Sequence, residues 1–75
     1  MKTLQEILFE HTLKALHTYS DAATREAASG GGPEFAGLRI ITEVRRQRLA
    51  TIFEVIEEAG LVEEYQEWRK QHDQG

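Results

Sequence analysis

The sequence predicts an all-α protein: an antiparallel helical hairpin followed by a short third helix. Its apolar residues recur at spacings of three and four and do not alternate, so nothing indicates a strand. Its glycines are confined to positions 30–32, 37, 60 and 75. Except for Gly37, they lie between the long periodic runs or at the chain end. At 75 residues without cysteine, we expect one domain, 1–75, with no disulfide and no thiolate metal site.

The first predicted helix covers residues 3–28. Thr3 is its expected N-cap, because Glu6 three residues later can complete a capping box. Apolar side chains cover one broad side of this helix, and charged side chains share the other. An apolar arc so wide contacts two neighbours rather than one, and the alanine-rich far end allows close approach. The arc holds Leu4, Ile7, Leu8, Ala15, Leu16, Tyr19, Ala22 and Ala23.

The second helix is predicted over 33–59 and the third over 61–71. Residues 29–32 form the hairpin loop, and Pro33 suits the first turn of a helix, where its missing N–H is not needed. No strand precedes the glycines and no Gly-Lys-Ser/Thr follows, so a phosphate loop is not expected. Gly60 suits the left-handed residue that ends a helix, with Leu61 folded back onto Ile56.

Arginines interrupt the predicted inner seam of the second helix. An unpaired guanidinium is costly to bury, so Arg45 and Arg48 must be paired, reach an edge, or face another molecule. One interpretation is a polar layer that fixes the register of a dimeric bundle. Another is a partner contact in which Arg45, Arg46 and Arg48 bind a carboxylate or phosphate. The predicted seam reads Leu38, Ile41, Arg45, Arg48, Ile52, Val55 and Ala59.

A nucleic-acid-associated regulator that uses Arg39, Arg45, Arg46 and Arg48 is the alternative function. The chain as a whole argues against it, because its net charge is -4 and its isoelectric point is near 5.3. The helix that follows Gly60 is acidic and would repel phosphate.

Tyr65 and Trp68 lie on one face of the third helix. They either lock this helix onto the hairpin or form an exposed anchor for a partner, since such residues dominate interface hot spots. No cofactor or metal is expected. The three histidines do not share a face, and the pair Glu54 and Glu57 has no second acidic pair opposite it.

We therefore expect a non-catalytic protein–protein interaction module, an adaptor or inhibitor of the kind that phages and mobile elements encode. A chain this small gains stability by pairing, so a homodimeric bundle is expected. No apolar run approaches 18 residues and no leader pattern opens the chain, so we expect a cytoplasmic protein with no membrane span. The expected dimer interface comprises Leu4, Leu8, Leu16, Tyr19, Ile41 and Ile52.

Overall fold

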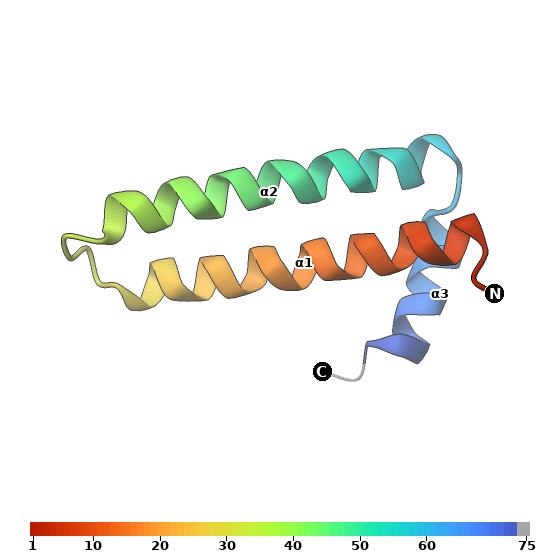
Figure 1. Ribbon diagram of the computed structural model, residues 1–75, viewed down its shortest axis with the longest axis horizontal. Helices are drawn as coiled ribbons and strands as arrows, with labels where there is room; N and C mark the ends of the chain where they lie inside the picture. Colours follow the sequence, from red (N-terminus) through yellow and green to blue (C-terminus); the bar gives the residue numbers. More distant parts are fainter. Residues whose placement is uncertain (74–75) are drawn as a thin grey trace.

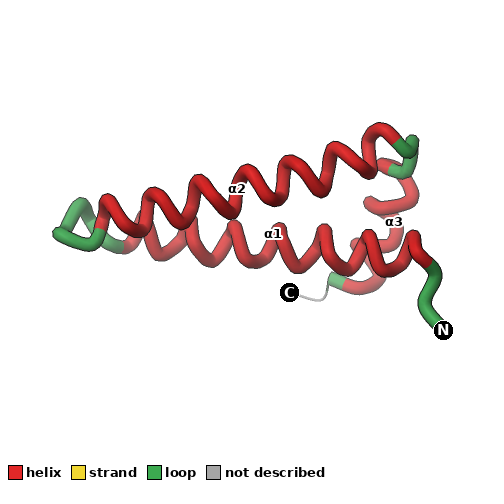
Figure 2. Tube along the Cα trace, turned by 45° about the horizontal axis from the view of Figure 1, so that its top comes forward, coloured by secondary structure: helices red, strands yellow, loops and turns green. Residues whose placement is uncertain are grey.

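The computed structural model describes residues 1–73, and it confirms a helical hairpin with a short third helix. Helices α1 (Leu4–Ala28) and α2 (Phe35–Glu58) lie antiparallel along their whole length, and α3 (Val62–His72) packs at the open end near the N-terminus (Figure 1). Everything described is helix or loop (Figure 2). The result is an elongated molecule of 45 × 25 × 21 Å.

The hairpin loop forms as the glycines predict, although α2 begins slightly later than expected. At the start of α1, the Glu6 N–H donates to the Thr3 hydroxyl at 3.1 Å, so Thr3 is the N-cap. Gly30 and Gly31 reverse the chain with left-handed φ angles of 62° and 80°. The Phe35 N–H then donates to the Gly32 carbonyl at 2.9 Å, which closes a separate turn. Pro33 therefore lies in this turn, and α2 begins at Phe35.

Gly60 ends α2 in the predicted way. Its φ is 71°, and its N–H donates to the Glu57 carbonyl at 3.1 Å. The Leu61 N–H donates to the Ile56 carbonyl at 3.0 Å, which completes a Schellman motif. Leu61 also packs against the core that contains Ile56. This motif turns the chain sharply and directs α3 back across the hairpin.

An aromatic cluster holds α3 on the hairpin. Phe9, Ile56 and Tyr65 are buried and come from the three different helices. The Phe9 ring meets Tyr65 edge-on at 5.4 Å between centroids, and it lies 5.7 Å from Trp68. Phe53 of α2 adds a second edge-on contact to Tyr65 at 6.1 Å. Tyr65 and Trp68 therefore lock α3 in place, which is the first of the two roles considered for them.

The broad apolar arc of α1 contacts two neighbours, both from the same chain. Ala15 and Ala22 are buried in the hairpin, where their small side chains let the helices approach closely. Phe9 is buried against α3. The two neighbours expected for this arc are therefore supplied within the chain by α2 and α3, although Leu4 and Ile7 at its start remain 86% and 38% exposed.

The inner seam of α2 is rotated from the predicted one. Thr42 and Ile56 are buried, whereas the predicted seam residues Ile41 and Val55 are 47% and 49% exposed. The Thr42 hydroxyl lies 3.1 Å from the Ala22 carbonyl of α1 and 2.9 Å from the Leu38 carbonyl, so one proton can serve either acceptor. The rotation follows from the core, since the cluster at α3 draws Ile56 inward.

Candidate interaction surface

The side of the hairpin away from α3 carries a shallow basic groove. Its volume is about 230 Å³, and no residue of α3 lines it. Successive turns of α1 and α2 supply its walls, because both helices present a residue there every three or four positions. We call this site the basic groove, lined by His11, Lys14, Ala15, Thr18, Arg45, Arg48 and Ile52.

The cations of the basic groove have no carboxylate beside them. Within residues 1–73, no hydrogen bond or ion pair engages the side chains of Lys14, Arg45 or Arg48. Arg45 is half-buried and Arg48 is exposed. No acidic residue lines the groove. The groove is therefore a positively charged surface whose donors remain available to an anionic group.

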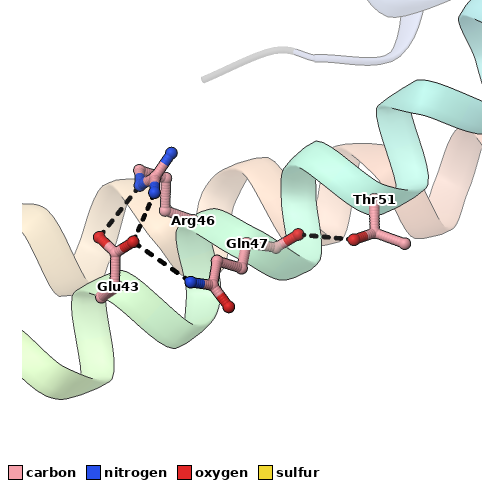
Figure 3. Close-up of polar contacts among 4 residues, drawn as sticks. All are labelled: Glu43, Arg46, Gln47 and Thr51. Atoms are coloured by element: carbon pink, nitrogen blue, oxygen red, sulfur yellow. Dashed lines mark hydrogen bonds and ion pairs between the residues drawn. The ribbon is translucent and has the colours of Figure 1, made fainter.

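Arg46 differs from its neighbours because it is already paired. Its guanidinium donates two hydrogen bonds to the Glu43 carboxylate, one from Nε to Oε2 and one from Nη2 to Oε1 (Figure 3). The Gln47 amide donates to the same carboxylate at 3.4 Å. The hydrogen bond and charge of Arg46 lower the pKa of Glu43, and Glu43 in turn raises the pKa of Arg46. The Thr51 hydroxyl donates back to the Gln47 carbonyl at 2.9 Å in the same view.

The arginine cluster of the sequence is thus divided among different faces. Arg46 lines a separate apolar groove on the α3 side, together with Leu16 and Tyr65. Arg39 is exposed and lines neither groove. Only Arg45 and Arg48 converge, so no continuous basic stripe of four arginines exists.

Beside the basic groove, α2 presents an uncovered apolar stripe. Its outer members Ile41, Val44 and Val55 are 47%, 53% and 49% exposed. Ile52 is half-buried and joins the stripe to the groove. The nearby Ile40 is also 66% exposed. We call this surface the α2 stripe, and it consists of Ile41, Val44, Arg48, Ile52 and Val55.

The remaining predicted interface residues do not lie together. Leu8 packs against the core, and Leu16 lies on the α3 side. Tyr19 is half-buried, whereas Leu4 is 86% exposed near the open end. Of the six residues expected at a dimer interface, the uncovered side brings together Ile41 and Ile52.

Tyr65 and Trp68 contribute little open surface. Tyr65 is 2% exposed, and Trp68 is half-buried with its ring stacked on His72 at 4.4 Å. Burial raises the pKa of the Tyr65 phenol, while the nearby Arg69 charge opposes this rise and Asp73 adds to it. Asp73 also lies 3.3 Å from the His17 ring nitrogen, which ties the end of α3 to α1.

Three groove residues, His11, Lys14 and Thr18, were not predicted from the sequence. Lys14 belongs to the charged side of the first helix, and the histidines share no face, so neither pattern indicates a groove. Their spacing of three and four was the available signal, since it places all three along one line of the helix. Only the register of the hairpin sets that line beside Arg45 and Arg48.

The described residues offer little else for chemistry. Among residues 1–73, no group of three or more His, Cys, Asp or Glu side chains converges on a common point for a metal ion. No helix in this part of the chain is both long and apolar enough to cross a membrane. The surface features described for this part of the chain are the basic groove, the apolar groove on the α3 side and the α2 stripe.

The exposed area is large for so small a chain. The protein exposes 5649 Å², whereas a compact monomer of 8.6 kDa exposes about 4,700 Å². The elongated shape of 45 × 25 × 21 Å and the exposed N-terminus, with Leu4 at 86%, contribute to this area.

Comparison with known proteins gave no significant match to a family model, a curated protein or a solved structure.

Proposed function

We propose that the protein is a small non-catalytic interaction module, an adaptor or inhibitor that binds another polypeptide through the α2 stripe and the adjoining basic groove. The α2 stripe carries this proposal. Ile41, Val44 and Val55 recur at helical spacing, and each side chain is about half exposed. Contact with another molecule would bury this apolar surface. A row of this kind is the pattern by which one helix docks on another.

A protein partner is favoured over nucleic acid by the arrangement of the arginines. Arg46 is engaged by Glu43 and Arg39 lies apart, so of the four arginines only Arg45 and Arg48, beside Lys14, could meet the same phosphate backbone. The apolar stripe beside them suits a helix better than a phosphate chain. The phage or mobile-element origin expected from size extends this proposal to an inhibitor of a host protein.

Affinity capture with matched variants tests the proposed function. Wild type, Val44→Glu and Ala36→Glu serve as baits in an extract of cells that express the protein. Val44 lies on the α2 stripe, whereas Ala36 is exposed on α2 and lines neither groove, so both variants add the same charge at different places. We expect a partner that wild type and Ala36→Glu retain and Val44→Glu loses. Equal recovery of every protein on all three baits would contradict the proposal.

A further inference from the structure

The α2 stripe has a symmetric pattern. Val44 and Ile52 each lie four residues from Arg48, and Ile41 and Val55 each lie seven residues from it. The stripe therefore reads the same from either end: two apolar residues, an arginine, and two apolar residues. It spans about 21 Å of helix.

We propose that two copies of the chain pair antiparallel along α2, with Arg48 of both copies on the two-fold axis. This inference rests on the proposed function, because it names a second copy of the chain as the first polypeptide that occupies the α2 stripe, which any other partner must then displace. A two-fold interface is isologous, so each residue must meet a suitable partner when the surface is inverted onto itself. Here Ile41 of one copy meets Val55 of the other, and Val44 meets Ile52.

The exposed area is consistent with this pairing. The chain exposes 5649 Å², about a fifth more than a compact monomer of its mass. Among residues 1–73 the buried apolar set is small for a folded domain, since its large side chains are Phe9, Ile56 and Tyr65. Domains of this size without disulfides or metals commonly gain stability from a second subunit.

The overall charge of the two halves of α2 favours the antiparallel orientation over the parallel one. The C-terminal end of α2 is acidic, with Glu54, Glu57 and Glu58, whereas its first half carries Arg39, Arg45 and Arg46 against Glu43. Antiparallel pairing sets the acidic end of one helix beside the net-basic half of the other, while Arg39 and Glu57 themselves lie on the side of α2 opposite Arg48. Parallel pairing would place the two acidic ends together. The helix dipoles also oppose one another in the antiparallel arrangement.

Arg48 is the residue that fixes the register. At the axis it meets its own copy, with Arg45 and Lys14 of the basic groove nearby. Like charges at this layer weaken the pair, but a shift of one helical turn would place arginine against isoleucine or valine. A polar residue at one position of an apolar seam specifies register at a cost in stability. The flat, weakly hydrated guanidinium tolerates such a position better than lysine would.

Light scattering across a dilution series tests whether the chain pairs. We expect wild type to be a dimer and Val44→Glu to be a monomer. The dimer dissociation constant of Arg48→Leu should be at least about tenfold lower than that of wild type. Circular dichroism verifies that each variant is folded. A wild-type monomer overturns the inference. This holds even if Arg48→Leu forms a dimer, because the arginine would then prevent a second copy from binding. If capture by the α2 stripe persists in that case, the proposed function survives.

Cysteine cross-linking tests the orientation, since the chain has no cysteine of its own. Ile41→Cys and Val55→Cys, mixed and oxidised, should form a mixed disulfide, because antiparallel pairing brings these positions within bonding range. Either variant alone should not link to itself, and the exposed Glu57→Cys serves as a collision control. Self-linkage of Ile41→Cys would indicate parallel pairing. That result, or no linkage above the control, would overturn the inference.

Discussion

At the scale of single residues, Tyr65 combines a buried ring with an ionisable group. Its ring joins the aromatic cluster of Phe9 and Trp68, and burial raises the pKa of its phenol. The folded state therefore holds the phenolic proton more tightly than the unfolded state, whose tyrosines ionise near pH 10. Stability from this group is fully present below about pH 10 and is lost as pH rises through the folded pKa.

We predict that wild type loses free energy of unfolding between about pH 8 and pH 11, and that Tyr65→Phe loses less. Phenylalanine keeps the ring contacts and has no proton to release. Urea unfolding at both pH values, followed by circular dichroism, measures the difference. Other groups titrate in this range in both proteins, so the comparison isolates Tyr65. Identical losses in the two proteins would refute the prediction.

At the scale of elements, the glycine within α2 and the glycine that ends this helix have opposite roles. Gly60 adopts a left-handed φ of 71° in the motif that ends α2, whereas Gly37 lies within the helix. A methyl group at either position would meet open space, so crowding does not distinguish them. The backbone conformation alone decides the effect of a substitution.

We expect Gly60→Ala to lower the free energy of unfolding by about 1 kcal/mol or more, because alanine resists the left-handed region. Gly37→Ala should raise it by about 0.5–1 kcal/mol, because alanine is the better helix former. Thermal melts of both variants beside wild type provide the measurement. An unchanged melt for Gly60→Ala would show that the turn between α2 and α3 does not require glycine.

At the scale of the whole molecule, salt distinguishes self-pairing from the binding of an anion. Each copy carries a net charge of -4, and the proposed axis gathers Arg45 and Arg48 from both copies. Added salt screens both repulsions, with a screening length of about 8 Å at physiological ionic strength. A complex with nucleic acid responds in the opposite direction, because salt competes with phosphate contacts.

We predict that the dimer dissociation constant falls as sodium chloride rises from about 0.05 to 0.5 M, by severalfold or more. Sedimentation equilibrium at several salt concentrations measures it. Arg48→Leu separates the two repulsions, because it removes the central arginine pair and makes the net charge of -4 on each copy more negative by one. A weaker salt dependence in this variant would assign most of the effect to the central pair. A dissociation constant that rises steeply with salt would mean that attraction between opposite charges holds the complex together.

The sequence by itself determined the local features of this protein. Thr3, the glycines at 30–32 and Gly60 mark the helix ends correctly, because caps and left-handed turns depend on a few neighbouring residues. The start of α2 is predicted at Pro33 but lies at Phe35, because a separate turn closed by Gly32 and Phe35 intervenes. Tyr65 and Trp68 were recognised as candidates, but periodicity did not choose between a lock and an anchor.

Only the tertiary structure decided which side of α2 faces inward. This helix carries two apolar rows close together on its surface, one with Thr42 and Ile56 and one with Ile41 and Val55. Local pattern does not rank two such rows. The aromatic cluster at α3 draws Ile56 into the core, and this contact rotates the whole helix. The same rotation leaves Ile41, Val44 and Val55 uncovered and sets Arg45 and Arg48 beside Lys14, because a helix turns as one rigid body.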